Sequence, residues 1–323
     1  MKALCVFSGG LDSMLAADLI RAQGIDVLAL FFETPFFTAQ RAVKSAGSID
    51  IPLKVVDITK RHLKVVRNPI HGYGGNMNPC IDCHALMFRI AGEMLDQERA
   101  DFIITGEVLG QRPMSQNKQS LRMVASESGY ANLLLRPLSA KLLPLTLPEE
   151  KGWVNRDLLM DFQGRTRKPQ MEMAALRNFN DYPSPAGGCL LTEKVFSRRL
   201  KDLFTQGEET EIREIEILKL GRHFRLAPVE KIVVGRNKTE NEAILALSKD
   251  TDYILTSANG PGPVVLALGD FTDSSLALAA SITASYSDAK EGTQTPVKIK
   301  RGEEQRLIMA TAMKKTEFVC YML

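Results

Sequence analysis

The sequence predicts an α/β fold in which a doubly wound, mainly parallel sheet is followed by a second, smaller α+β domain. Short apolar segments alternate with amphipathic ones through the first half of the 323 residues. Apolar residues make up 45% of the chain and charged residues 24%, as in globular proteins. A polar stretch with five glutamates, at residues 204–216, separates the two parts. We therefore expect two domains, residues 1–205 and 206–323.

The first elements form a predicted βαβ unit. An apolar strand over residues 3–7 leads through a glycine-rich turn into a helix over 13–23, which Gly24 ends, and then into a strand over 26–32. The pattern continues with strands at 53–56 and 101–105 and helices at 37–46 and 85–95. Ligands of such sheets bind at the carboxyl ends of the strands.

The next segment is more irregular. We expect a loop at 142–148, helices at 156–162 and 169–179, and a Gly/Pro-rich loop at 182–189. After the domain boundary, the pattern predicts strands at 231–234, 252–256, 264–268, 295–299 and 318–322, and helices at 238–246 and 274–286.

Composition excludes some classes of protein. Apolar runs such as 27–32 are far shorter than the roughly 20 residues of a membrane-spanning helix. Polar residues from Ser8 onward interrupt the N-terminal apolar run before a secretory signal could form, so we expect a cytoplasmic protein without a membrane partner. The net charge of +3 does not by itself indicate a nucleic-acid binder. Residues 165–201 carry eight basic and three acidic side chains, which suits either a solvated helical face or a phosphate-binding patch.

The turn after the first strand has the features of a phosphate-binding loop. It consists of Ser8, Gly9, Gly10, Leu11, Asp12 and Ser13. Backbone N–H groups and the positive helix end converge there, and the two glycines allow a ligand to approach the backbone closely. The serine hydroxyls can donate hydrogen bonds, and Asp12 can hold Mg²⁺ beside phosphates. No lysine follows, so this is not a Walker loop.

Three cysteines stand in loop sequences. Cys80 and Cys83 form a C-x-x-C pair after Asn78-Pro79, and Cys189 follows two glycines. Such a set is compatible with zinc, with a redox disulfide or with an iron-sulfur cluster. The other two cysteines are less informative, because Cys5 lies in an apolar strand and Cys320 has no nearby partner.

Ligand number separates the metal alternatives. A structural zinc site needs four protein ligands, and only His84 or the distant cysteines are available as a fourth. Three thiolates with one open position suit a 4Fe-4S cluster whose free iron accepts an exogenous ligand such as hydrosulfide. In that interpretation the metal ligands are Cys80, Cys83 and Cys189.

The loop from Ser8 to Ser13 resembles the SGGxDS signature of the PP-loop ATP pyrophosphatases. The resemblance implies an adenine nucleotide alpha hydrolase-like fold, with ATP and Mg²⁺ as cofactors. It also implies cleavage between the α- and β-phosphates, so that AMP is attached to a carbonyl oxygen and a nucleophile then displaces it. Together with Asn78–Cys83, Thr105-Gly106 and the PAGGC segment at 185–189, it resembles the tRNA thiouridine synthetases over about residues 1 to 200.

That resemblance implies roles for individual residues. Cys80 and Cys189 would act together on sulfur, as in the 2-thiouridylases, or would hold a cluster together with Cys83. Asp12 would take part in catalysis. Thr105 and Gly106 would contact the adenylate, and Phe32 the adenine. Glu107 stands where related branches commonly have histidine.

The sequence does not decide the source of the sulfur or the role of Arg112. The sequence shows no rhodanese-like domain, so the sulfur would come from sulfide or from a separate persulfide donor. Arg112 would meet phosphate or tRNA, or would be an ordinary surface residue.

The second domain resembles the RNA-binding module of the NFACT proteins over roughly residues 221–322. The resemblance rests on Gly235-Arg236-Asn237, Asn241-Glu242 and the segment 260–264. It implies contact with tRNA, with phosphate contacts from Arg222, Arg225, Arg236 and Lys238. Residues 206–323 hold 15 basic and 17 acidic side chains, so binding would need a local patch.

Taken together, these features predict an ATP-dependent tRNA sulfurtransferase that adenylates a uridine carbonyl oxygen and replaces it with sulfur to give thiouridine. The target uridine would flip out of its stack. Two alternatives stay open: an amide-forming PP-loop ligase with a structural metal site, and a non-catalytic RNA-binding adaptor that responds to ATP. The sequence leaves open which uridine is modified, whether a cluster or a persulfide carries the sulfur, and the oligomeric state, a homodimer included.

Overall fold

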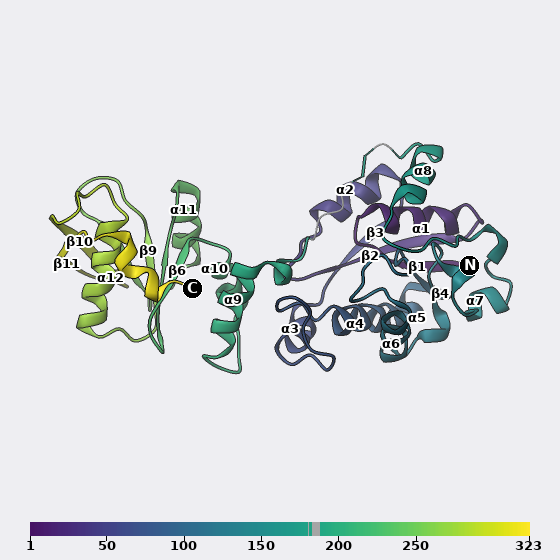
Figure 1. Cartoon of the computed structure of the whole chain (residues 1–323), viewed down its shortest axis with the longest axis horizontal. Helices are drawn as coiled ribbons and strands as arrows, with labels where there is room; N and C mark the ends of the chain where they lie inside the picture. The colour runs from purple at the N-terminus through teal and green to yellow at the C-terminus, as the bar shows by residue number, and fades with distance from the viewer. Residues whose placement is uncertain (180, 183–187) are drawn as a thin grey trace. The chain divides into compact units, whose positions relative to one another are not determined.

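The computed structural model describes residues 1–179, 181–182 and 188–323, and these form two compact units, Met1–Thr192 and Glu193–Leu323 (Figure 1). The division falls before helix α9 (Lys194–Phe204), whereas the sequence suggested a boundary after it. Helix α9 packs on α10 (Ile212–Leu218), and the guanidinium of Arg199 donates to the carbonyls of Leu218 and Gly221. These contacts make α9 part of the second unit.

The first unit contains a sheet of five strands in the order β3-β2-β1-β4-β5, and every pair is parallel. Its strands are β1 (Lys2–Val6), β2 (Asp26–Glu33), β3 (Leu53–Asp57), β4 (Phe102–Thr105) and β5 (Leu134–Leu135). Its α-helices are α1 (Leu11–Arg21), α2 (Gln40–Ser48), α3 (Thr59–Arg67), α4 (Cys80–Glu93), α5 (Leu95–Glu98), α6 (Lys118–Ser128), α7 (Leu147–Glu150) and α8 (Lys168–Leu176). Its 3₁₀ turns are η1 (Ala131–Leu133), η2 (Ala140–Leu142), η3 (Arg156–Leu158) and η4 (Leu190–Thr192).

The strand order places a topological switch point between β1 and β4. From β1 the chain proceeds outward through β2 and β3, and it returns to the other side of β1 with β4. Val6 pairs with Thr105, so the carboxyl ends of β1 and β4 are direct neighbours. In open parallel sheets the ligand crevice forms at such a point.

Helices cover both faces of this sheet. Helices α1, α2 and α8 lie on one face and α3 to α6 on the other (Figure 1). Side chains of β1 alternate between them: Ala3 and Cys5 pack in the core beneath α1, and Leu4 packs in the core beneath α4. This arrangement confirms the predicted doubly wound parallel sheet.

The second unit is a mixed α+β module around a six-stranded antiparallel sheet in the order β11-β10-β8-β9-β7-β6. Its strands are β6 (Arg222–Ala227), β7 (Glu230–Val234), β8 (Tyr253–Ser257), β9 (Val265–Leu268), β10 (Gln294–Arg301) and β11 (Glu304–Thr311). Helix α12 (Asp273–Ser285) packs on one face, and α10 with α11 (Lys238–Leu247) packs on the other. The predicted smaller α+β domain is confirmed.

Several element predictions were wrong. The expected strand at 318–322 belongs to a 3₁₀ helix, η5 (Lys315–Tyr321), which buries Phe318 in the core. The last strand is instead β11, an edge strand whose side chains are mostly exposed, including the apolar Leu307 and Met309. The sequence also missed β5, β6, α3 and α6, expected a loop where α7 forms, and expected a helix at 156–162, where only the turn η3 forms. In the described part of the chain, no helix has the length and apolarity to cross a membrane.

Candidate active site

The phosphate loop is held in shape by its own hydrogen bonds. The hydroxyl of Ser13 donates to the carbonyl of Gly10 at 2.8 Å, and the hydroxyl of Ser8 lies 3.3 Å from the Gly10 nitrogen and 3.4 Å from the Ser13 hydroxyl. Gly9 has φ +72°, and a Cβ there would lie 2.8 Å from the Cα of Ala42. Only glycine fits this position, so the loop can pack directly against α2.

Asp12 is held at the start of α1 by residues far away in sequence. The amide of Gln111 donates to its Oδ2 at 2.8 Å, and Gln170 in turn donates to Gln111 at 3.0 Å. Arg167 lies 3.5 Å from Oδ1, which is buried and accepts no hydrogen bond from the described residues. Asp12 therefore has one buried carboxylate oxygen that is ion-paired with Arg167 but accepts no hydrogen bond from the described residues.

The end of β4 closes against the phosphate loop. Thr105 is buried, and a Cβ on Gly106 would lie 2.4 Å from the nitrogen of Ser13. The backbone of residue 106 thus lies directly on the first turn of α1. Thr105 and Gly106 border the same loop as the serines.

Glu107 continues from this contact into a buried ionic network. Its two carboxylate oxygens accept from Nδ1 of His84 and Nε of Arg136, each at 2.9 Å. Burial alone would raise the pKa of Glu107, but the charge of Arg136 and the hydrogen bond from His84 outweigh it and leave the pKa below its usual value. The network fixes the chain beyond β4 and connects it to α4, which begins with the cysteines.

Two residues of the predicted nucleotide site lie in the core. Phe32 is 3% exposed and packs with Leu30 and Ile58, so its ring presents almost no surface to a nucleotide. Leu11 is 1% exposed and packs with Leu15 beneath α8. Their described surroundings are those of packing residues.

The three loop cysteines interact with one another. Cys80 is the first residue of α4, Cys83 lies one turn later, and Cys189 directly precedes η4. Burial raises the pKa of Cys83 well above its usual value, and the charges of Cys189 and Cys80 raise it further. Burial also raises the pKa of Cys189 to about 11, while the charge of Arg112 lowers it. Thiols more than a hundred residues apart thus lie within electrostatic range of one another.

Polar neighbours position these sulfurs. Nε2 of His62 lies 3.1 Å from Sγ of Cys83, and the amide of Asn78 donates to Sγ of Cys80 at 3.3 Å. His62 is fully buried against the rings of Phe36 and Phe37, and burial lowers its pKa to about 4. A neutral imidazole is therefore in contact with the Cys83 thiol at physiological pH.

A hydrogen bond connects the described parts of the two cysteine loops. The amide of Asn76 donates to the carbonyl of Thr192 at 2.8 Å, and the hydroxyl of Thr192 donates back to the carbonyl of Cys189 at 2.7 Å. The backbone of Leu190 also donates to Phe36, at the end of the loop after β2. The predicted loop residues Pro185, Ala186 and Gly187 lie outside the described residues.

The described residues contain no group of three or more His, Cys, Asp and Glu side chains arranged to hold a metal ion. The donor type of the three thiols suits a cluster, but their arrangement does not form its ligand set. Cys5 is fully buried in β1, as expected, and burial raises its pKa strongly. Cys320 is exposed in η5 of the other unit.

Sequence reasoning missed Gln111, Arg167, His62 and Asn76 as parts of this site. Only their positions in the fold bring them to Asp12 and the cysteines. One signal was present for Gln111, since it directly follows the Glu107–Gly110 segment at the end of β4.

The four cationic side chains suggested for RNA contact in the second unit differ in their ion-pair and aromatic partners. Asp202 pairs with Arg225 at 2.6 Å, and Glu240 pairs with Arg236. Lys238 is 91% exposed and only 3.9 Å from Glu242. Arg222 instead lies over the ring of Tyr286 at 5.2 Å, with Lys315 at 5.1 Å from the same ring. Arg222 and Lys315 thus form a cationic pair around an aromatic ring, and sequence reasoning missed Lys315.

Comparisons with known proteins match the two parts of the chain separately. Residues 1–141 match the family described as thiamine biosynthesis protein (ThiI), and residues 221–322 match the NFACT protein RNA binding domain. A probable tRNA sulfurtransferase of Oceanobacillus iheyensis is 30% identical over 146 residues, which cover 42% of this chain and 34% of that protein. The chain thus spans about a third of the length of this curated relative.

A second curated protein and a solved structure are also similar to part of the chain. The tRNA-specific 2-thiouridylase MnmA of Karelsulcia muelleri is 28% identical over 173 residues, which cover 48% of this chain and 44% of that protein. Among solved structures, a 4-thiouridine synthetase in complex with RNA and bound ATP is 19% identical, with a TM-score of 0.34. The match covers 56% of this chain and 54% of that one.

Proposed function

We propose that the chain is an ATP-dependent tRNA sulfurtransferase, because residues 1–141 match the family described as thiamine biosynthesis protein (ThiI) and residues 221–322 match the NFACT protein RNA binding domain. It would adenylate a uridine carbonyl oxygen and replace that oxygen with sulfur, giving thiouridine. The similarity to a probable tRNA sulfurtransferase over 42% of the chain supports this proposal.

The observation that carries the proposal is that residues 111 and 112 connect the phosphate loop with one of the loop thiols. Gln111 hydrogen-bonds Asp12 of the phosphate loop, and the charge of the next residue, Arg112, acts on the thiol of Cys189. This connection supports a site that combines an anion-binding loop for ATP with a sulfur atom that can act as a nucleophile. A phosphate loop alone would not choose between sulfur and ammonia.

The first step is activation of the base. The uridine carbonyl oxygen attacks the α-phosphorus of ATP, and pyrophosphate leaves. Backbone N–H groups of the loop and the hydroxyls of Ser8 and Ser13 would bind the phosphates. Asp12 Oδ1 accepts no hydrogen bond from the described residues and is paired with Arg167 at 3.5 Å, and as a carboxylate oxygen it would hold Mg²⁺, which commonly takes one carboxylate together with phosphate oxygens.

The second step delivers sulfur. The terminal sulfur of a persulfide on Cys189 attacks the activated carbon, and AMP leaves with the former carbonyl oxygen. The Cys80 thiolate then attacks the Cys189 sulfur, which leaves thiouridine and a Cys80–Cys189 disulfide. A separate thiol reductant reduces the disulfide, and a separate persulfide donor recharges Cys189. With hydrosulfide as the nucleophile, attack is direct and no disulfide forms.

The cluster alternative concerns the same thiols. A 4Fe-4S cluster on Cys80, Cys83 and Cys189 would present hydrosulfide on its open iron. Since the described thiols do not form that ligand set, none of the steps above depends on a cluster. Iron and acid-labile sulfide analysis after anaerobic purification separates the two versions: iron-free, fully active protein rejects the cluster.

Because tRNA is the proposed substrate, the proposed site of activity is the cytoplasm.

The test uses the full chain with ATP, Mg²⁺, unmodified tRNA and a sulfide or persulfide donor. We expect AMP, pyrophosphate and thiouridine, the last measured by mass spectrometry of nucleosides. Cys189→Ala should abolish thiouridine, and the matched control Cys320→Ala, at an exposed thiol of the other unit, should not. Activity with ammonia that survives Cys189→Ala would indicate the ligase alternative. Binding of tRNA without AMP formation would indicate an adaptor.

A further inference from the structure

Arg41 lies between the phosphate loop and the Cys189 loop. It is in the first turn of α2, next to Ala42, which contacts Gly9. On its other side, its Nη1 would lie 3.8 Å from a Cβ at Gly188. Arg41 is exposed, and within the described parts of the chain its guanidinium makes no hydrogen bond or ion pair.

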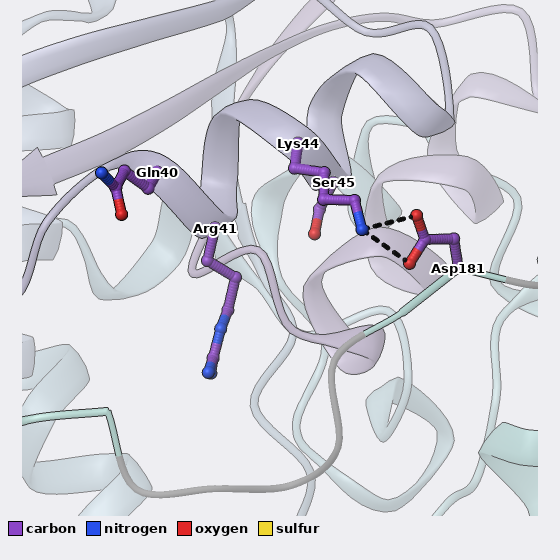
Figure 2. Close-up of a pocket in the computed structure, with 5 residues that line it drawn as sticks. All are labelled: Gln40, Arg41, Lys44, Ser45 and Asp181. Carbon is purple, nitrogen blue, oxygen red and sulfur yellow. Dashed lines mark hydrogen bonds and ion pairs between the residues drawn. The ribbon is translucent and has the colours of Figure 1, made fainter.

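A pocket of about 320 Å³ opens beside this arginine. Its lining consists of Gln40, Arg41, Lys44, Ser45 and Asp181. Figure 2 shows that Lys44 is paired with Asp181, at 2.9 Å, while Arg41 points away from that pair. The hydroxyl of Ser45 donates to the carbonyl of Gly9 at 2.8 Å, so the pocket directly adjoins the phosphate loop. Arg41 is the cation of this pocket that no described carboxylate neutralises.

Arg112 directly follows a residue that contacts the phosphate loop. The preceding residue, Gln111, donates to Asp12 at 2.8 Å, which fixes the segment against the loop. The positive charge of Arg112 acts on the thiol of Cys189. Arg112 is also exposed, and its guanidinium has no hydrogen bond or ion pair with any residue that the structure describes. Among the described residues, two guanidinium groups without a carboxylate partner therefore lie near Cys189: Arg41 beside Gly188, and Arg112, whose charge acts on the thiol.

Exposure distinguishes these arginines from the cation beside Asp12. The side chain of Arg167 is only 18% exposed and lies 3.5 Å from the Asp12 carboxylate, so it is placed to meet a nucleotide inside the crevice. Arg41 and Arg112 face solvent, where phosphates of a large substrate arrive. A planar guanidinium binds a phosphate through two parallel hydrogen bonds.

We infer that Arg41 and Arg112 bind backbone phosphates of the RNA substrate next to the nucleotide that enters the cysteine site. The inference rests on the proposed function and deepens it. It gives the first unit its own RNA contact, separate from the NFACT RNA-binding domain. The two arginines are positioning residues, because they hold the substrate and take no part in bond making.

The experiment compares Arg41→Gln, Arg112→Gln and the double variant with wild type in the full chain. Arg99→Gln is the matched control, since Arg99 is exposed just before β4, at the amino edge of the sheet, where Asp101 pairs with Lys2. Affinity for unmodified tRNA is measured by fluorescence anisotropy between 50 and 200 mM salt, and ATP affinity and Tm are measured in parallel.

We expect each single variant to bind tRNA about three- to tenfold more weakly. The slope of log affinity against log salt should fall by about 0.9 for each lost arginine. ATP affinity, Tm and the control should match wild type. Unchanged tRNA affinity and salt slope would overturn the inference. Weaker ATP binding with unchanged tRNA binding would also overturn it and assign the arginines to the nucleotide phosphates.

The outcome is distinguishable from failure of the proposed function. If the variants lose tRNA affinity as expected but wild type forms no thiouridine, the RNA contact stands and the sulfurtransferase proposal fails. If wild type forms thiouridine and the variants bind tRNA normally, the sulfurtransferase proposal stands and the RNA contact fails.

Discussion

Replacing Gly106 with alanine tests whether β4 fixes the geometry of the phosphate loop. The new Cβ would lie 2.4 Å from the backbone nitrogen of Ser13 and 2.5 Å from the backbone carbonyl carbon of Asp12. Real Cβ atoms essentially never approach other atoms closer than 3.0 Å, so Ser13 and residue 106 must separate by about 0.6 Å, the difference between 3.0 and 2.4 Å. The obstructing atoms belong to the backbone of α1, and no side-chain rotation relieves the clash.

A shift of this size at the helix start displaces the N–H groups that would bind phosphate. Forcing an extra carbon into a packed site costs about 1–3 kcal/mol. A misplacement of about 1 Å at a reacting centre can slow a reaction about 100-fold. For Gly106→Ala we therefore expect a drop of roughly ten- to 100-fold in AMP formation, together with a lower Tm.

The assay follows AMP and pyrophosphate release and thermal unfolding. Gly47→Ala is the matched control, because Gly47 lies in α2 with no atom within 4 Å of the added Cβ. Alanine there should leave AMP formation unchanged and stabilise the helix by about 0.5–1 kcal/mol. If Gly106→Ala binds ATP and forms AMP like wild type, with an unchanged Tm, β4 does not set the loop geometry and our reasoning fails.

Three further predictions concern other contacts. Asn76→Ala removes the hydrogen bond to Thr192, which stabilises the contact between the two cysteine loops by about 1 kcal/mol. A thiol crosslinker should therefore join the two loops about fivefold more slowly in the variant than in wild type. An equal crosslinking rate would show that this hydrogen bond does not hold the loops together. Burial holds the pKa of His223 well below 6.5, so protons bind the unfolded chain preferentially below that pH. Relative to His223→Gln, the wild-type unfolding free energy should fall by about 1.4 kcal/mol per pH unit from pH 6.5 downward, and parallel denaturation curves would refute this. Replacing both Arg222 and Lys315 with alanine should weaken RNA binding and lower the slope of log affinity against log salt by about 1.8. Variants of the ion-paired arginines in the same unit serve as controls. The same slope in the double variant and in wild type would contradict the prediction.

The phosphate loop could be predicted because its signals are local. Gly9, Gly10 and Asp12 stand at the junction of an apolar strand and a helix, and the structure places them there. Neighbouring residues along the chain decide such a turn. The start of α4 at Cys80, after a proline, follows in the same way, although our prediction began that helix five residues later.

The partners of these residues could not be predicted. Gln111 and Arg167 meet Asp12 from about 100 and 155 positions away, and His62 meets Cys83 across the interface of α3 with α4. Phe32 is a related case: an aromatic residue at a strand end suggested contact with adenine, but the structure buries its side chain in the core. Contacts of this kind depend on how helices pack on the sheet, which no short pattern specifies.

The chemical groups of this protein can be read from its amino-acid order: a glycine-rich anion loop, three loop thiols and a parallel sheet whose strand ends lie at one edge. Which charged groups remain available to a ligand depends on the folded arrangement. Arg225 and Arg236 are neutralised by carboxylates, whereas Arg41 and Arg112 stay uncompensated beside Cys189 among the residues the structure describes. The physical reason is that a charged side chain acts on a ligand only where folding brings no opposite charge to it, and that depends on distances in space rather than positions along the chain.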